Sequence, residues 1–236
     1  MTGAARPESH APGYFDLRRD LEQPGCAVCR GASRSAWRLV DGLLWEGVTD
    51  PLTRTRLRRS RGFCREHSLM AIRVADAENG QLGMAIVYED LLAQLEAALG
   101  QEPAKPRWGG VARRSVPAPD LPCPACVSAL GTEENYLRLL GRADPTSELG
   151  TLARSGAGTL CLRHLRLGLA TTDPDEQRRL VQIALTGIAA MRGDLQEFIR
   201  KRDYRFSHEP LSAEEGDAWR RAVRFLEGEP VRRPDP

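Results

Sequence analysis

The sequence predicts an all-α protein: a tandem duplication of a four-helix unit, with one further helix at the C-terminal end. Ala, Leu, Arg and Glu dominate the 236 residues and β-branched residues are few, a composition that favours helix. The duplication is indicated by a C-x2-C-x34-C-x2-H pattern that occurs twice, 97 residues apart. The two sets are Cys26, Cys29, Cys64 and His67, and Cys123, Cys126, Cys161 and His164.

The first copy begins with one or two helical turns over residues 14–21, and a turn at 23–26 then presents the first CxxC. From Cys29 onward, apolar residues recur at the spacing of one helix face. These residues are Ala36, Val40, Leu43, Leu44 and Gly47. Asp50 and Pro51 predict the N-cap and the first position of a second, short helix.

Gly62 ends that short helix, and Phe63 and Cys64 open a third. After a turn at Asn79-Gly80, a fourth helix is predicted over about 81–99. Its apolar residues fall on one stripe, namely Met84, Tyr88, Leu91, Leu92, Leu95 and Leu99.

The second copy repeats this order of elements after a linker rich in proline and glycine. Its helices are predicted to begin at Cys123, at Asp144-Pro145, at Leu160-Cys161 and at Asp173-Pro174. Apolar positions also align at the 97-residue offset, which favours duplication over coincidence.

The C-terminal region has no counterpart in the first copy. Ser212 and Glu215 form a capping-box pattern that begins a last helix carrying Trp219, Val223 and Leu226. We expect this region to cover the seam between two packed repeats. The predicted division is a disordered tail over 1–13, repeat 1 over 14–100, a linker over 101–119, repeat 2 over 120–202, a loop and helix over 203–228, and a tail over 229–236.

Each Cys3His set is typical of a tetrahedral zinc site. Three thiolates and one imidazole fill the shell and leave no position for a substrate water, which is the mark of a structural site. We therefore expect two zinc ions, each joining two helix N-termini within one copy. The first ion is assigned to Cys26, Cys29, Cys64 and His67, and the second to Cys123, Cys126, Cys161 and His164.

Other chemistries of cysteine fit less well. A disulfide framework would leave one thiol over in each copy, because each copy has an odd number of cysteines. CxxC at a helix start is also the thioredoxin redox motif, but no βαβ context is predicted here. An iron–sulfur cluster on three cysteines and a histidine is the less favoured alternative cofactor.

Net charge, hydropathy and cysteine content together predict the cellular compartment of the protein. A net charge of +2 is too small to argue by itself for nucleic acid or a membrane surface. The first 15 residues contain no apolar core of a signal peptide, and no apolar run is long enough to span a bilayer. Six cysteines without an export signal favour a reducing compartment, so we predict a cytoplasmic protein.

Two polar clusters lie outside the metal sets. Five arginines between positions 54 and 61 could bind nucleic acid, but a solvated helix face is favoured. The loop over 203–210 offers residue types that bind ligands or transfer protons. Its candidate ligand-binding residues are Tyr204, Arg205, His208 and Glu209. A structural role for this loop, with Tyr204 and Phe206 filling the core, is equally favoured.

Trp45 is favoured as a core residue and Glu46 as a solvated one.

The segments GLLWEGVTDP, GFCREH, CPAC, CLRHL, DYRFSHEP and DAWRRAV together carry a resemblance. Over about residues 21–228, the chain resembles an uncharacterised prokaryotic family known only as a domain of unknown function. That family shares the paired CxxC and CxxH elements and a DYRF-x-x-EP segment. The resemblance implies a cytoplasmic helical protein in which the eight residues named above bind metal. It brings no activity, substrate or partner.

The sequence contains no nucleophile triad, P-loop or dinucleotide fingerprint. We therefore expect a non-catalytic binding or adaptor protein whose partner is a protein or a small molecule. The first alternative is an enzyme or small-molecule sensor that uses the DYRFSHEP loop. The second is a nucleic-acid-binding regulator or an iron–sulfur or redox protein.

Overall fold

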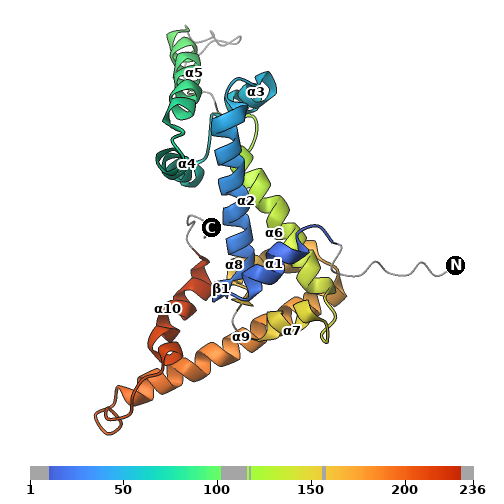
Figure 1. Ribbon diagram of the computed structural model, residues 1–236, viewed down its shortest axis with the longest axis vertical. Helices are drawn as coiled ribbons and strands as arrows, with labels where there is room; N and C mark the ends of the chain where they lie inside the picture. Colours follow the sequence, from blue (N-terminus) through green and yellow to red (C-terminus); the bar gives the residue numbers. More distant parts are fainter. Residues whose placement is uncertain (1–10, 102–115, 117, 156–157, 230–236) are drawn as a thin grey trace, which may run out of the picture. The chain divides into compact units, whose positions relative to one another are not determined.

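The computed structural model describes residues 11–101, 116, 118–155 and 158–229. The described chain is helical apart from one pair of two-residue strands, so the predicted all-α class is confirmed (Figure 1). The elements of the first half are α1 (Tyr14–Leu21), β1 (Gly25–Cys26), α2 (Ala27–Gly42), the π-helix η2 (Leu43–Gly47), α3 (Pro51–Ser60), α4 (Arg65–Ala77) and α5 (Gln81–Gly100). Those of the second half are α6 (Pro124–Arg142), α7 (Glu148–Arg154), β2 (Gly158–Thr159), α8 (Leu162–Thr171), α9 (Pro174–Lys201) and α10 (Ala213–Glu227).

The helices repeat with the same offset as the cysteines. The first residues of α2, α3 and α4 lie 97 positions before the first residues of α6, α7 and α8, as 124−27, 148−51 and 162−65 show. α5 corresponds to the longer α9, and α10 follows without a counterpart. The structure therefore repeats the duplication at the level of its helices.

Most of the predicted helix caps are present. The Asp50 carboxylate accepts a hydrogen bond from the Thr53 amide at 2.7 Å, and Asp173 caps α9 in the same way. Ser212 and Glu215 form both hydrogen bonds of a capping box. The prediction for α7 is wrong, because its N-cap is Ser147 and not Asp144. Asp144 instead accepts bonds from Thr146, which form a turn ahead of the helix.

The described chain divides into two compact units that do not coincide with the predicted repeats. Of the described residues, unit 1 contains those of 11–33 and 130–229, and unit 2 contains those of 34–129. α2 begins in unit 1 and ends in unit 2, while α6 begins in unit 2 and ends in unit 1. Each unit therefore takes parts of both sequence copies.

Unit 1 has a core built from α1, the first residues of α2, the later part of α6, and α7 to α9. Three of the six cysteines belong to this core, which is otherwise aliphatic and aromatic. Tyr136 lies against Gly31, and its hydroxyl donates a hydrogen bond to the buried Asp20 at 3.1 Å. α10 packs on α9 and α8 through a face that contains Ala218 and Phe225. Trp219, Val223 and Leu226 of the same helix are about half exposed.

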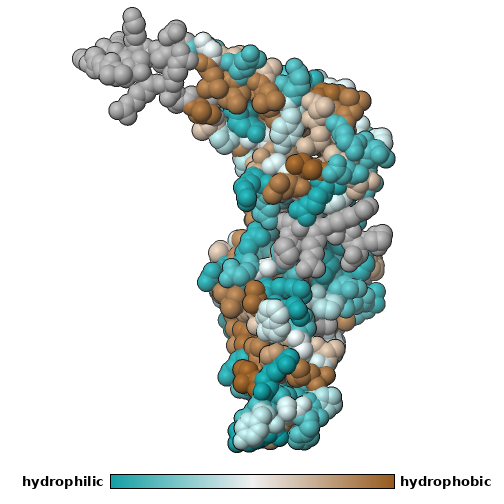
Figure 2. All heavy atoms as spheres, turned by 90° about the vertical axis from the view of Figure 1, so that its left-hand side faces the viewer, coloured by the Kyte–Doolittle hydropathy of each residue, from teal (hydrophilic) through white to brown (hydrophobic). Residues whose placement is uncertain are grey.

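Unit 2 has its own core, in which Trp37 is buried and Trp45 is 64% exposed. The expectation that Trp45 is a core residue is wrong, because the π-helix η2 places it outside the buried face of α2. The buried residues of α5 are Gly83 and Val87, and the predicted stripe is only partly buried: Leu92 is 64% and Leu99 42% exposed, and its other four residues are intermediate. Figure 2 shows apolar side chains, in brown, at the surface near the upper end of the molecule.

Most residues of the predicted tails and of the predicted linker lie outside the described residues. Within the described part of the chain, no helix combines the length and apolar character that a membrane span requires.

Candidate metal centres

The eight predicted residues gather into two groups of three cysteines and one histidine. Cluster 1 consists of Cys26, Cys29, Cys161 and His164, and cluster 2 consists of Cys64, His67, Cys123 and Cys126. The prediction of two Cys3His groups is confirmed, but the assignment of each group to one sequence copy is wrong. Each cluster takes its CxxC from one copy and its CxxH from the other. Cluster 1 lies wholly in unit 1 and cluster 2 wholly in unit 2.

The lengths of the helices explain this exchange. α2 and η2 together cover 21 residues (16 plus 5), which corresponds to about 30 Å of helix. The CxxC stands at the start of this long helical segment, and the CxxH of the same copy comes after the other end of the segment in sequence. The 10-residue α3 advances only about 15 Å, and the 7-residue α7 about 10 Å. Each CxxH therefore stays near the far end of its own long helix, where the other copy's long helix begins.

Backbone contacts join the same segments that the ligands join. In unit 1, β1 pairs in parallel with β2: Gly25, directly before Cys26, lies opposite Gly158, which stands three residues before Cys161. In unit 2, the Asp120 and Leu121 amides donate hydrogen bonds to the Arg59 carbonyl at 2.7 and 3.2 Å. The entry to each CxxC is thus tied to the entry to the partner CxxH.

Cluster 1 is compact and fully buried. His164 Nδ1 lies 3.4 Å from Cys26 Sγ, 3.4 Å from Cys29 Sγ and 3.2 Å from Cys161 Sγ. Cys29 Sγ and Cys161 Sγ are 3.7 Å apart. Relative exposure is 0% for His164 and 7% or less for the three cysteines, so solvent has little access to these ligand atoms.

A buried carboxylate lies behind the histidine of cluster 1. Glu133 Oε1 is 3.2 Å from His164 Nε2 and 3.0 Å from an Arg163 nitrogen. The contact with Nε2 is an ion-pair contact without the alignment of a hydrogen bond. Burial raises the pKa of Glu133, but His164 and Arg163 outweigh burial and hold this pKa below its usual value. Sequence analysis did not single out Glu133, which stands 31 residues before His164 and on another helix.

Without a cation, cluster 1 can hold only a limited negative charge. Its neighbours Cys161 and Cys26, together with burial, raise the pKa of the Cys29 thiol far above its usual range. Hydrogen bonds from Cys26 and Cys29 lower the pKa of Cys161. Burial lowers the pKa of His164, but its bonds to Cys161 and Cys26 and its contact with Glu133 raise it to about 11. Loss of the Cys29 proton is thus opposed by burial and by the neighbouring sulfurs unless a cation is present, and metal binding requires this loss.

Cluster 2 has the same set of atoms in a more open setting. His67 Nδ1 lies 3.2 Å from Cys64 Sγ, 3.3 Å from Cys126 Sγ and 3.8 Å from Cys123 Sγ. Cys64 Sγ and Cys126 Sγ are 3.6 Å apart. His67 and Cys123 are buried, whereas Cys64 and Cys126 are partly exposed. Burial, the hydrogen bond with Cys64 and the charge of Cys123 raise the pKa of Cys126 to about 12.

These distances fit a single metal ion in each cluster. A tetrahedral ion with metal–sulfur bonds of about 2.3 Å places its sulfur ligands about 3.8 Å apart. The observed sulfur–sulfur separations of 3.7 and 3.6 Å agree with this edge and exclude a disulfide, whose bond is about 2.05 Å. In both clusters Nδ1 is the histidine atom that faces the sulfurs. Both groups could therefore hold a metal ion.

The chain beyond α10 covers one edge of cluster 1. The Glu229 amide donates a hydrogen bond to Cys29 Sγ at 3.4 Å. Gly228 has a φ of +92°, and a Cβ at this position would lie 3.8 Å from Cys161 Sγ and 3.9 Å from Cys29 Sγ. Sequence analysis assigned position 229 to a tail and missed this contact. The Glu-Gly-Glu sequence at 227–229, with glycine directly after the last helical residue, was the available signal.

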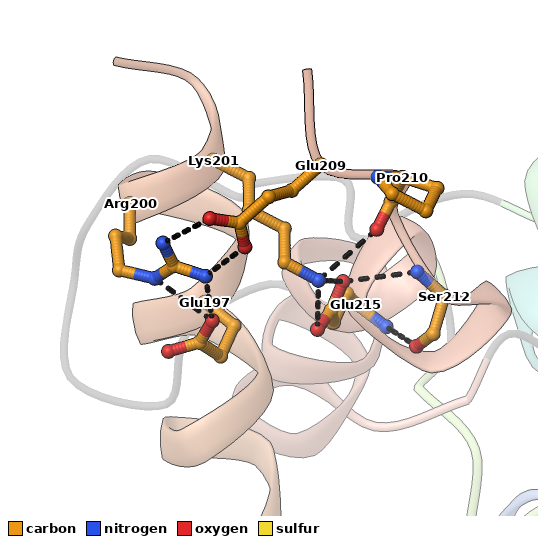
Figure 3. A network of polar contacts seen from close by, with 7 residues as sticks. All are labelled: Glu197, Arg200, Lys201, Glu209, Pro210, Ser212 and Glu215. Atoms are coloured by element: carbon orange, nitrogen blue, oxygen red, sulfur yellow. Dashed lines mark hydrogen bonds and ion pairs between the residues drawn. The ribbon is translucent and has the colours of Figure 1, made fainter. Parts of the chain in front are cut away.

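The DYRFSHEP loop connects α9 to α10 in unit 1, and a network of ion pairs closes it (Figure 3). Arg200 pairs with Glu209 and Glu197, and Lys201 Nζ lies 2.7 Å from Glu215 and 3.0 Å from the Pro210 carbonyl. The hydrogen bond from Arg200 lowers the pKa of Glu209.

The four candidate ligand-binding residues of this loop do not form a convergent group. Glu209 is engaged by Arg200, and Arg205 pairs with Asp203 at 2.7 Å. His208 is exposed, and Tyr204 is 85% exposed and therefore does not fill the core. Phe206 lies between the guanidinium groups of Arg200 and Arg205. The structure thus shows contacts that stabilise the loop.

The arginines of α3 are partly engaged within unit 2. Arg58 forms a two-pronged contact with Asp90 of α5 at 2.7 and 2.8 Å, and Arg54 adds a contact at 3.2 Å. These guanidinium groups lower the pKa of Asp90. Glu46 is exposed on η2, at the rim of a cavity of about 400 Å³ next to α3.

Comparison with known proteins adds one relative. No family model matches the chain, and no solved structure matches it. The chain is 28% identical over 212 residues to an uncharacterized 23.9 kDa protein in the xynA 3' region of Caldicellulosiruptor sp. (strain Rt8B.4). The match covers 89% of this chain and 98% of the relative. Because the relative has no described function, this finding agrees with a resemblance to an uncharacterised family.

Proposed function

We propose that each cluster holds one zinc ion and that the protein is a non-catalytic, metal-stabilised binding or adaptor protein. The observation that carries the proposal is the geometry of the eight ligand atoms, which lie within 4.8 Å of one another in each group of four. Three soft thiolates and one imidazole are a ligand set that zinc prefers. A filled shell of four protein ligands leaves no open position for a substrate or a reactive water.

The ligand spacing supports one ion over an iron–sulfur cluster. In a cluster of two or more irons the ligands are divided between iron atoms, so that four ligand atoms do not all lie as close together as the 4.8 Å found in each group here. The sulfur–sulfur distances of 3.6 and 3.7 Å match the single-ion case.

The position of cluster 1 supports a structural role. Its ligands belong to the core of unit 1 and connect the starts of α2 and α8, which lie more than 130 residues apart in sequence. An ion bound here stabilises the contacts between these distant segments, because it binds the folded chain and not the unfolded chain. Glu133 supports the histidine in the way that outer carboxylates support zinc-bound imidazoles.

Metal analysis tests this proposal. Protein purified without chelators is expected to contain two zinc ions per chain, and removal of zinc is expected to lower the melting temperature. Replacement by cobalt should give the absorption bands of tetrahedral cobalt with thiolate ligands, and added azide should leave them unchanged because the shells are closed. Brown protein containing iron and sulfide would contradict the choice of zinc. A cobalt spectrum altered by azide would contradict the non-catalytic, closed site.

A further inference from the structure

Cluster 2 has one edge that differs from every edge of cluster 1. Cys64 Sγ and Cys126 Sγ are 3.6 Å apart, and both residues are partly exposed. The other two ligands of cluster 2, His67 and Cys123, are buried. The two accessible sulfurs are therefore also neighbours.

The duplication supplies an internal control for this edge. Adding 97 to positions 64 and 29 gives 161 and 126, so the pair Cys64–Cys126 corresponds to the pair Cys161–Cys29 of cluster 1. The sulfur–sulfur distances of 3.6 and 3.7 Å are nearly equal. Proximity of the sulfurs therefore does not distinguish the two pairs.

What distinguishes them is the cover supplied by the C-terminal region. Gly228 and Glu229 lie over Cys29 and Cys161, and the Glu229 amide donates its hydrogen to Cys29 Sγ. This donation also withdraws negative charge from the sulfur and makes it a weaker nucleophile. Among the described residues of sequence copy 1, no element corresponds to α10 and the two residues that follow it.

We propose that Cys64 and Cys126 form a redox modification site, at which a peroxide links the two sulfurs as a disulfide and releases the metal ion of cluster 2. The inference rests on the proposed function for the presence of that ion. Both pairs are thiolates when metal is bound, so the site responds first because Cys64 and Cys126 are partly exposed while Cys29 and Cys161 are buried.

Hydrogen peroxide is the only oxidant that the reaction requires. One metal-bound thiolate attacks a peroxide oxygen, the O–O bond breaks, and the sulfur becomes a sulfenic acid while hydroxide leaves. The second thiolate attacks that sulfur, the S–S bond forms, and a second hydroxide leaves. Two electrons pass from the two sulfurs to hydrogen peroxide, and two protons convert the hydroxides to water. Only His67 and Cys123 then remain as ligands, and a zinc ion held by two ligands is released.

Loss of this ion has a defined structural consequence in unit 2. Cys64 is the N-cap residue of α4, and Cys126 lies in the first turn of α6. Their ligation ties these two helix starts together, with the Asp120–Arg59 backbone contact beside them. A disulfide retains one link between the helices, while the links through the metal ion are lost.

The test oxidises the intact protein after its zinc content has been measured. Hydrogen peroxide is added in steps from one to ten equivalents, released zinc is followed with a chromogenic chelator, and disulfides are mapped by peptide mass spectrometry. We expect one zinc ion per chain to be released about tenfold faster than the other, with Cys64 linked to Cys126 in the same fractions. The matched control is the pair Cys29–Cys161 in the same molecules, which should stay reduced.

Several results would overturn the inference. These are oxidation of cluster 1 first or at the same rate, a first disulfide between Cys123 and Cys126, and absence of any disulfide at ten equivalents. The two proposals fail separately. Protein without bound metal contradicts the zinc proposal, whereas disulfide mapping in that same protein still decides whether Cys64 and Cys126 react first.

Discussion

Clusters 1 and 2 contain the same ligand atoms at nearly the same distances, yet their surroundings differ. The ligands of cluster 1 are buried in the core of unit 1, and Gly228 and Glu229 cover the edge between two of its sulfurs. Two sulfurs of cluster 2 reach the surface of unit 2. The ligand pattern therefore determines whether a metal ion can bind. The surrounding chain determines how strongly the ion is held and how easily reagents in solution reach the ligands.

The largest expected difference between the clusters is in stability. Cys161→Ser and Cys64→Ser should each remove one zinc ion, because a hydroxyl is a poor replacement for a thiolate ligand. Cys161→Ser should unfold unit 1, since the free energy of structural zinc binding is of the order of 10 kcal/mol and cluster 1 is part of the core. Cys64→Ser should lower the free energy of unfolding by less, because Cys64 is partly exposed at the edge of unit 2.

Guanidinium unfolding of both variants, with metal analysis of each, measures this difference. An equal loss of stability, or a larger loss for Cys64→Ser, would remove the distinction between a core cluster and an edge cluster.

Acid should weaken metal binding at both clusters. Near neutral pH the metal-free cluster 1 holds protons on His164, whose pKa is raised to about 11, and on Cys29, whose pKa is also raised. A metal must displace both protons, so affinity should fall at least about 100-fold for each pH unit below neutrality. At cluster 2 the raised pKa of Cys126, about 12, requires displacement of at least one proton, and so a fall of at least about tenfold per unit. Chelator competition between pH 6 and 8 measures both slopes, and an affinity independent of pH at either cluster would contradict this expectation.

Replacement of the outer carboxylate should affect cluster 1 alone. Glu133→Gln removes the charge beside His164 Nε2 and should weaken zinc binding there by about 10- to 100-fold. Glu176→Gln is the matched control, because Glu176 is equally buried but pairs with Arg142 at 2.6 Å, away from the ligands. Zinc competition assays check both variants, and an equal effect would show that Glu133 acts only through general stability.

The cover over cluster 1 should be sensitive to one methyl group. At a φ of +92°, Gly228→Ala costs about 1 kcal/mol of backbone strain, which should raise the rate of zinc removal from cluster 1 about fivefold. Gly216→Ala is the control, since its added methyl group meets no atom within 4 Å. Stopped-flow chelation distinguishes the two variants, and an unchanged rate in Gly228→Ala would show that Gly228 and Glu229 do not protect the sulfurs.

Much of this comparison could be predicted from the sequence. The repeated ligand pattern gave all eight residues and the presence of two groups, and Asp50, Asp173 and Ser212 marked true helix starts. Local rules suffice for these features because a cap or a CxxC turn involves residues close in sequence.

The grouping of the ligands could not be read from spacing alone. The grouping depends on whether the short helix after each long helix is long enough to bring the CxxH back to the CxxC of the same copy. This depends on helix lengths in three dimensions. The cover by Glu229 and the support by Glu133 also join segments far apart in sequence, 200 residues for Cys29 and 31 for His164. The only partly buried stripe of α5 shows the same limit, because periodicity identifies an apolar face but not how fully another element covers it.

The exchange of ligands between the two copies is tested most directly by counting zinc ions in two double variants, with refolding in excess zinc. In the arrangement described here, Cys26→Ser with Cys161→Ser damages only cluster 1 and should leave one zinc ion per chain, whereas Cys26→Ser with Cys64→Ser damages both clusters and should leave none. One zinc ion after the Cys26 and Cys64 changes, and none after the Cys26 and Cys161 changes, would contradict it.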